Sequence, residues 1–302
     1  MKPEMDLSEL RSDITTLENS QSLFEETNFV SRFEAIDYLD FHVIERIDQL
    51  LLEPDPQQEL AVLKQKAKSL KSRLEEIDLN LFLRIRSDIK SGICTGLAFK
   101  NEINKFLDTS TVTPEKEIGY DCLDLLINGI LPPQNIPEET KAREPEMVYY
   151  QKTPARIIFE LVDRAKFLGK DVFYDLGSGL GQVCTLVNLL SGARSVGVEF
   201  EPGFCNYARA CTCELNLKNV DFINEDARLA RYSDGTVFFM YTPFTGRLLQ
   251  DVLELLRHES QVKMIRIFTF GPCTTQVSQQ SWLKPEGHNS YDINKLCEFR
   301  SI

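Results

Sequence analysis

The chain has 302 residues, of which 42% are apolar and 26% charged, and its formal net charge is −12. This composition is typical of a folded protein and excludes a chain that is mainly disordered. The acidic excess lies in the first half, since residues 1–150 hold 29 acidic and 17 basic residues and residues 151–302 hold 17 of each. That half would repel a phosphate backbone, which argues against a nucleic acid as partner, although one basic face can still bind it.

No uncharged apolar stretch is long enough to span a membrane, and the acidic N-terminal residues are unlike a signal peptide. The eight cysteines follow no regular framework, which fits reduced thiols. Cys211 and Cys213 would point about 200° apart on one helix, so they cannot share a metal ion. We therefore expect a cytoplasmic protein without a metal site. The sequence indicates no oligomeric state.

The first half of the chain is expected to be helical. Apolar residues recur at spacings of three, four or seven over residues 7–51, a Pro-rich turn follows at 53–56, and a second stripe runs from Leu60 to Leu81. Such a stripe needs a partner, and the short turn favours the preceding helix. We expect an antiparallel hairpin in a small bundle, with association of two chains as the alternative. A basic run on the second helix is interpreted as a solvated face: Lys64, Lys66, Lys68, Lys71 and Arg73.

A shorter helix is predicted over Gly119–Ile130. Residues 131–145 contain four prolines and are expected to form a linker or a loop over the next domain. The sequence thus divides into an N-terminal helical domain, residues 1–145, and a second domain, residues 146–302. The second domain opens with a predicted helix, for which Thr153 is a good N-cap and Pro154 suits the first helical position.

A glycine loop comes after that helix. Residues 171–182, DVFYDLGSGLGQ, form an apolar run that stops at Asp175 and turns through Gly177, Gly179 and Gly181 into a helix. The glycines are one position short of the dinucleotide pattern G-x-G-x-x-G, whose third position here is Gln182, so a pyrophosphate loop is the weaker interpretation. Strands and helices alternate from this loop to the end of the chain, which indicates α/β structure with a parallel, doubly wound sheet.

The run from Asp175 to Gln182 resembles motif I of the class I S-adenosylmethionine (SAM)-dependent methyltransferases. The letters DLGSGLGQV are most similar to the loop of the histone-lysine methyltransferases of the disruptor-of-telomeric-silencing type, over little more than residues 173–199. The resemblance implies a Rossmann-like sheet of seven strands, the last antiparallel, and S-adenosyl-L-methionine as cofactor. Residues 281–299 look like the family's terminal hairpin, which argues against a nicotinamide enzyme.

The resemblance also assigns the cofactor contacts. Glu199 ends the second strand, where a carboxylate can accept hydrogen bonds from both ribose hydroxyls. Glu201 is the alternative, although an exposed residue before a proline is more typical of a turn or cap. Asp226 matches the family's adenine-binding aspartate, and its alternative is a cap for a helix over 228–232. The cofactor-binding candidates are Tyr150, Thr153, Asp175, Gly177, Ser178, Gly179, Gly181, Gln182, Glu199 and Asp226.

Tyr149 joins Tyr150 and Thr153 as a candidate because the segment before motif I often folds over the cofactor in this family. The alternative for both tyrosines is packing of the next helix against the sheet. The fourth strand ends at the catalytic candidates Tyr241, Thr242, Pro243 and Phe244, where the family keeps its acceptor-facing motif. Electron-rich rings at these positions can surround a cationic centre.

The acceptor motif departs from two patterns. Enzymes that methylate amide or base nitrogens usually have Asp or Asn and two prolines, whereas here Thr242 precedes one proline, and the histone-lysine enzymes have asparagine in this loop. We therefore predict a SAM-dependent methyltransferase that acts on an unidentified protein or small-molecule acceptor, with nucleic acid disfavoured. A catalytically silent SAM-binding or interaction protein is the alternative, and a nucleotide-dependent oxidoreductase is the poorer one.

Overall fold

The structure, a computed structural model, describes residues 3–53, 58–107, 121–287 and 292–302. It divides into two compact units: residues 1–85 with 101–116, and residues 86–100 with 117–302. The domain boundary expected at residue 145 stays a prediction. No helix in the described part of the chain is both long enough and apolar enough to cross a membrane.

The first unit is helical, as the apolar spacing predicts. Its elements are α1 (Pro3–Asn19), a 3₁₀ turn η1 (Gln21–Phe24), α2 (Phe29–Tyr38), a π-helical segment η2 (Leu39–Ile44), α3 (Glu45–Leu50) and α4 (Gln58–Lys90). The last turn of α4 belongs to the second unit, and α5 (Leu97–Asn104), which the sequence does not predict, is shared between the units. The stripe Leu60, Leu63, Ala67, Leu70 and Leu74 packs with residues of α1 and with Ala35, Leu39, Val43 and Ile47 in one core.

Ion pairs show that α4 runs antiparallel to the segment before it. Lys64 pairs with Asp48, Lys71 with Asp40, and Arg32 with Asp78, so the order along α4 reverses the order along α2, η2 and α3. Lys66 pairs with Glu18 of α1. The lysine run is therefore not simply a solvated face, because three of its members bridge neighbouring helices.

The second unit contains helices α6 (Cys122–Ile130), α7 (Ala155–Ala165), α8 (Gln182–Ser191), α9 (Pro202–Glu214), α10 (Gly246–Ser260) and α11 (Cys273–Ser278). Its strands are β1 (Val172–Leu176), β2 (Arg194–Glu199), β3 (Val220–Asn224), β4 (Val237–Tyr241), β5 (Arg266–Phe270), β6 (Leu283–Glu286) and β7 (Cys297–Ser301). The described strands form one sheet in the order β3-β2-β1-β4-β5-β7-β6. Strands β1 to β5 pair in parallel, and β7 inserts antiparallel between β5 and β6, which confirms the predicted seven-stranded Rossmann-like fold.

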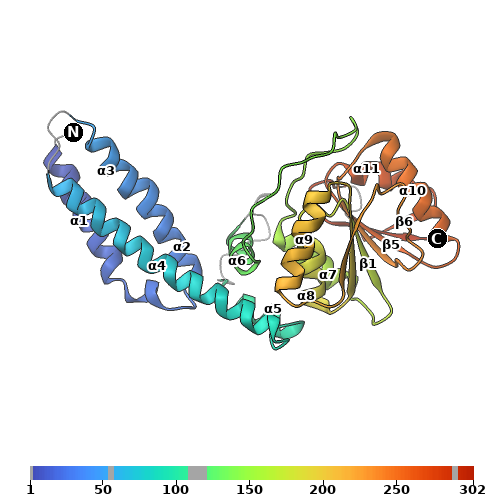
Figure 1. The fold of residues 1–302 in the computed structure, drawn as a ribbon, viewed down its shortest axis with the longest axis horizontal. Helices are drawn as coiled ribbons and strands as arrows, with labels where there is room; N and C mark the ends of the chain where they lie inside the picture. Colours follow the sequence, from blue (N-terminus) through green and yellow to red (C-terminus); the bar gives the residue numbers. More distant parts are fainter. Residues whose placement is uncertain (1–2, 54–57, 108–120, 288–291) are drawn as a thin grey trace. The chain divides into compact units, whose positions relative to one another are not determined.

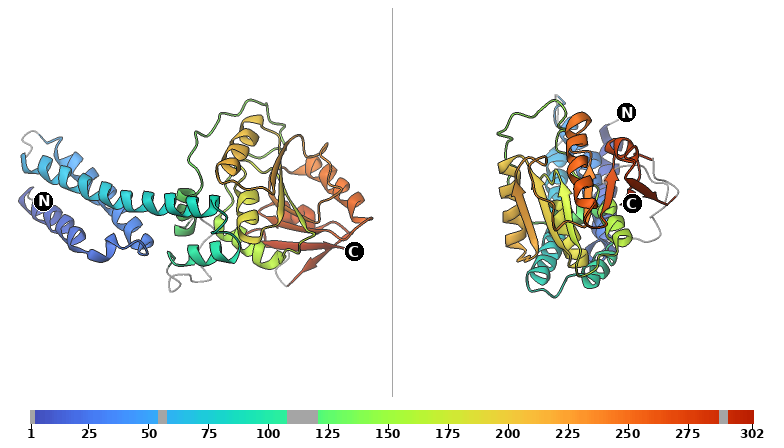
Figure 2. Two further views of the ribbon diagram at one scale, coloured as in Figure 1. Left: turned by 60° about the horizontal axis from the view of Figure 1, so that its bottom comes forward. Right: turned by 90° about the vertical axis from the view of Figure 1, so that its right-hand side faces the viewer.

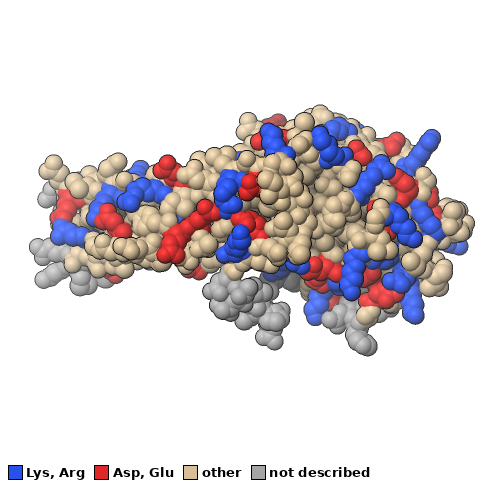
Figure 3. All heavy atoms as spheres, turned by 90° about the horizontal axis from the view of Figure 1, so that it is seen from below, with Lys and Arg blue, Asp and Glu red and all other residues tan. Residues whose placement is uncertain are grey.

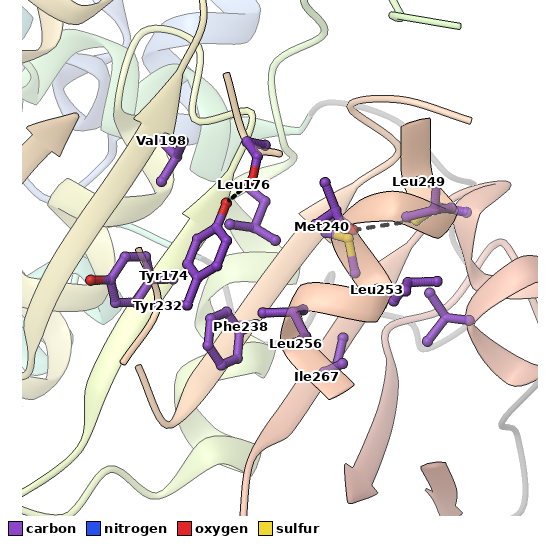
Figure 4. Packing of buried hydrophobic residues seen from close by; sticks show 14 of the residues in the cluster. Tyr174, Leu176, Val198, Tyr232, Phe238, Met240, Leu249, Leu253, Leu256 and Ile267 are labelled. Atoms are coloured by element: carbon purple, nitrogen blue, oxygen red, sulfur yellow. Dashed lines mark hydrogen bonds between the residues drawn. The ribbon is translucent and has the colours of Figure 1, made fainter. Parts of the chain in front are cut away.

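The sheet is covered on both faces. Helices α7, α8 and α9 lie on one face and α10 and α11 on the other (Figure 1). Figure 4 shows how the second face is filled: Phe238, Met240 and Ile267 of β4 and β5 meet Leu249, Leu253 and Leu256 of α10. All six side chains are buried. This packing fixes the strands whose carboxyl ends carry the candidate site.

Several local predictions differ from the structure. Helix α7 begins at Ala155 behind an N-cap at Pro154, and the Ala155 N–H donates to Asp124 of α6 at 2.8 Å, so Thr153 is not its cap. Residues 228–232, all described, contain turns and no helix. Three predicted stretches lie partly outside the described residues: the first two residues of the helix predicted over Gly119–Ile130, residues 54–56 of the Pro-rich turn predicted at 53–56, and residues 288–291 of the tail.

Stability of the helical unit is expected to depend on Arg32. Its fully buried guanidinium donates from Nε to Asp78 at 2.6 Å and from Nη1 and Nη2 to the main-chain oxygens of Leu23, Glu25 and Glu26. Arg32→Met removes one partner of a buried pair and should lower the free energy of unfolding of the unit by about 3–5 kcal/mol. Urea denaturation followed by circular dichroism measures this change.

Lys71→Met is the matched control in the same hairpin. Its pair with Asp40 is partly exposed to solvent, so its loss should change the free energy of unfolding by less than about 1 kcal/mol. Equal effects of the two substitutions would contradict a special role for the buried pair.

Candidate functional site

The glycine loop joins β1 to α8 at the carboxyl end of the sheet. Gly177, Gly179 and Gly181 have φ angles of 77°, 51° and 79°, all in the left-handed region. The N–H groups of Gly177 and Ser178 donate to Val198 O at 2.9 and 3.0 Å, which ties the loop to β2. A Cβ on Gly179 would lie 2.2 Å from Cε2 of Tyr150, so only glycine lets this ring rest on the loop.

Two carboxylates lie beneath the loop. Glu199 Oε2 accepts the Gly179 N–H and Oε1 accepts the Glu201 N–H, both at 2.8 Å. Each oxygen can accept a further hydrogen bond, so the predicted ribose contacts remain compatible with these bonds. Burial raises the pKa of Glu199. Burial, and then the charge of Glu199, raises the pKa of Asp175 to about 8.

Asp226 follows β3 and is held by a neighbour. Its carboxylate accepts the Arg228 N–H at 2.8 Å and the Arg228 Nε and Nη2 groups at 3.0 and 2.6 Å. The hydrogen bonds from Arg228 lower the pKa of Asp226. The side chain therefore caps the turn after β3 while lining the pocket, and its predicted adenine contact stays a prediction.

A strap, defined as residues 131–154, crosses the carboxyl ends of the strands (Figures 1 and 2). Glu201 holds its middle: the carboxylate accepts the Thr140 N–H and hydroxyl at 2.8 Å and the Lys141 N–H at 2.9 Å. Glu201 also caps α9 through Gly203, as the cap interpretation expects, but it is only 4% exposed because the strap covers it. Burial raises its pKa, and these hydrogen bonds outweigh burial and lower the pKa of Glu201 to about 2.

The strap is fixed again near the acceptor motif. Glu146 accepts the Arg247 and Leu248 N–H groups at 3.0 and 2.7 Å, which satisfies the first turn of α10. Val148 N–H donates to Pro243 O at 3.0 Å, and Met147 bridges to Phe244 in antiparallel fashion. The strap and the acceptor motif therefore form one continuous wall.

The two strap tyrosines have different surroundings. The Tyr150 ring lies on Gly179 and packs at 5.6 Å from the ring of Phe204. Tyr149 is 75% exposed and carries the guanidinium of Arg143 at 3.2 Å from its ring centre. The alternative prediction, that both tyrosines pack α7 against the sheet, is therefore wrong. Thr153 is buried and lines the pocket.

The acceptor motif presents mainly rings and main chain. Thr242 has φ 42°, an unusual value for a β-branched residue. Its hydroxyl donates to Phe270 O at 3.2 Å and accepts the Cys273 N–H at 3.1 Å, so it is bonded within the protein. Tyr241 packs against Phe270, and Phe244 is buried in the core of the second unit.

One pocket brings most of the predicted residues together. Of the candidates, those that line it are Tyr149, Tyr150, Thr153, Asp175, Gly177, Ser178, Gln182, Glu199, Asp226, Tyr241, Thr242, Pro243 and Phe244. Gly179 and Gly181 support the loop without lining the pocket. Sequence reasoning missed Glu139, Lys141, Arg143, Met147 and Phe200, which also line it. The sequence predicted the strap's contribution only at its C-terminal end, through Tyr149, Tyr150 and Thr153, and the preceding residues were expected as a Pro-rich linker or a loop over the second domain.

The pocket holds polar groups that need a ligand. Within the described residues, Ser178 Oγ and both amide atoms of Gln182 are buried without a hydrogen-bond partner. Such orphaned groups fit the polar methionine portion of SAM, which the glycine loop can approach closely. No group of His, Cys, Asp and Glu side chains in the described ranges is arranged to hold a metal ion.

Comparison with known families identifies the enzyme class. Residues 143–282 match the family model described as Histone methylation protein DOT1. Together with the sheet order, this match shows that the chain is a class I SAM-dependent methyltransferase with SAM as cofactor. No curated protein sequence matches the chain.

The chain is also similar to solved methyltransferase structures. An RNA methyltransferase from Salinibacter ruber in complex with S-adenosyl-L-homocysteine shares 23% identity, with a TM-score of 0.41, over 50% of this chain and 92% of its own. A SAM-dependent methyltransferase from Aquifex aeolicus shares 15% identity, with a TM-score of 0.38, over 49% of this chain and 93% of its own.

SAM affinity is expected to rise with pH. Below its pKa of about 8, the Asp175 carboxyl of the free protein holds a proton. The sulfonium and ammonium groups of SAM favour the carboxylate, so binding releases that proton. From about pH 6 to about pH 7.5, affinity should increase by at most about tenfold per pH unit. Isothermal titration calorimetry in buffers of different ionisation enthalpy measures both affinity and proton release.

Asp175→Asn should remove the dependence of SAM affinity on pH. The affinity for S-adenosylhomocysteine, which lacks the sulfonium charge, should depend on pH less strongly. A wild-type affinity that is constant over this range would contradict the role of Asp175.

The ribose assignment is tested by Glu199→Gln. The amide keeps one oxygen that can accept the Gly179 N–H, but it loses the charged oxygen that would accept hydrogen bonds from the ribose hydroxyls of SAM. SAM affinity should therefore fall about tenfold. Glu254→Gln on the exposed face of α10 is the control. If calorimetry finds the same affinity for Glu199→Gln and wild type, Glu199 does not bind the ribose.

Proposed function

We propose that this class I SAM-dependent methyltransferase transfers the methyl group to a nucleophile of a protein or a small molecule. The observation that carries the proposal is the inward bonding of the Thr242 hydroxyl to Phe270 and Cys273. The Thr242 hydroxyl is thus turned into the protein, and it does not take the place of the Asp or Asn side chain that accepts from the planar amino group of an amide or a nucleobase. The ring of Tyr241 also lines the pocket, and it is the group of this motif that we expect an acceptor to contact.

The chemistry demands little more than alignment from this site. SAM supplies a methyl group activated by its sulfonium centre, and the protein must exclude water and orient the acceptor. Asp175 and Glu199, the pocket carboxylates at the ends of β1 and β2, are both assigned to the cofactor, and the motif Tyr241–Phe244 at the end of β4 contains no acidic or imidazole side chain. We infer that the acceptor brings its own lone pair, as a thiolate, a carboxylate or a desolvated amine does.

The described residues on the one face that Figure 3 shows offer no extended basic surface for a nucleic acid. On the face that Figure 3 shows, the basic and acidic side chains of the described residues are interspersed. A nucleic-acid site usually needs a stripe of basic residues. We also propose the cytoplasm as the location, because all eight cysteines are described and none of them is in a disulfide.

Labelled methyl transfer tests the proposed acceptor class. The protein is incubated with methyl-labelled SAM and separate protein, small-molecule and RNA fractions of a cell extract, with excess S-adenosylhomocysteine as the control that blocks the site. Label is expected in the protein or the small-molecule fraction. Label confined to RNA would contradict the proposal, and no label in any fraction would favour a silent SAM-binding protein.

A thermal-shift series with SAM, S-adenosylhomocysteine and NAD gives an independent test of the cofactor. A ligand that binds only the folded state raises the unfolding midpoint according to RT ln(1 + [L]/Kd). The first two ligands should raise it and NAD should not.

A further inference from the structure

Arg143 is the strap residue whose surroundings are incomplete. Its Nε forms an ion pair with Glu139 Oε2 at 2.9 Å, and its guanidinium lies over the ring of Tyr149 at 3.2 Å from the ring centre. These two contacts fix the plane and direction of the group. Its Nη1 is buried, and no hydrogen-bond partner for it exists among the described residues.

An unpaired guanidinium N–H away from water is unfavourable, so a partner is expected in the functional state. A stacked guanidinium presents its N–H groups in a rigid fork that matches a carboxylate. Arg143 lines the pocket that holds the cofactor candidates. The missing partner is therefore best supplied by an anionic group bound in that pocket.

The charges of the side chains that line the pocket also point to Arg143 as the group that binds an anion. Its described lining includes six carboxylates and two basic side chains, Lys141 and Arg143. The carboxylates suit the sulfonium and ammonium groups of SAM. Lys141 is exposed, with Nζ over the ring of Phe200 at 4.1 Å. Arg143 is thus the pocket's most constrained donor to a negative charge.

We propose that Arg143 forms a carboxylate-binding subsite in the roof of the SAM pocket. The inference rests on the cofactor assignment and adds a ligand contact that the glycine loop and the strand-end acids do not provide. Two sources can supply the carboxylate: the methionine portion of SAM, or an acceptor molecule that enters beneath the strap. The chemistry of the subsite is the same in both cases.

Calorimetry with wild type, Arg143→Gln and Arg143→Lys separates the sources. With SAM as the source, Arg143→Gln should weaken SAM binding about tenfold and leave the affinity for decarboxylated SAM within about twofold. Arg143→Lys, which keeps the charge without the fork, should recover part of the loss. With the acceptor as the source, both ligands should bind Arg143→Gln as they bind wild type. Malonate should then bind the wild-type complex with S-adenosylhomocysteine and not that of Arg143→Gln.

Arg257→Gln is the matched control, because it makes the same substitution on an exposed side chain of α10 that does not line the pocket. Unfolding midpoints without ligand show whether each variant folds. The proposal is overturned if Arg143→Gln weakens SAM and decarboxylated SAM equally, if it changes neither SAM nor malonate binding, or if Arg257→Gln reproduces its effect. Failure of the wild-type protein to bind SAM would instead overturn the cofactor assignment, so the two failures are distinguishable.

Discussion

The hydrogen bond from the Gly179 N–H to the Glu199 carboxylate is the contact on which the site depends. It joins the loop after β1 to the end of β2, two adjacent parallel strands whose register is set by the sheet. Because the loop must approach this carboxylate and Tyr150 closely, it has no room for a side chain at Gly179. The loop can therefore reach the Glu199 carboxylate only when the sheet order, the glycine spacing and the position of the acid at the end of β2 are all as they are here.

The strap turns this open edge into a pocket. Its polar attachments include contacts to Glu201 before α9, to Arg228 through Glu144, and to the start of α10 through Glu146. Each attachment satisfies a charge or a set of main-chain N–H groups that would otherwise face solvent or remain unpaired. The pocket roof is thus built from polar contacts, and its aromatic lining is held in place by them.

Local sequence pattern was enough to predict most of the fold of the second unit. The strands, the glycine loop and the helices that cover the sheet are encoded by apolar spacing and glycine positions, and the antiparallel last strand was expected from family resemblance. The sequence did not predict several contacts between distant segments of the second unit. Asp124 takes the capping role expected of Thr153, and Glu201 is buried by a strap 60 residues away in sequence. Such contacts depend on tertiary arrangement, which residue spacing does not encode.

The acceptor motif shows why its chemistry was hardest to predict. By its position in the sequence Thr242 is a polar group facing a substrate, yet its left-handed backbone and inward hydroxyl make it a support for the turn. Pro243 lies directly above Gly177, where a Cβ would come within 2.3 Å of it, and its carbonyl accepts the Val148 N–H. The acceptor motif is therefore held between the glycine loop and the strap. Movement of the glycine loop or of the strap must therefore shift the surface that the motif presents to the acceptor. Cofactor binding and acceptor selection thus depend on the same contacts of Pro243 with Gly177 and Val148.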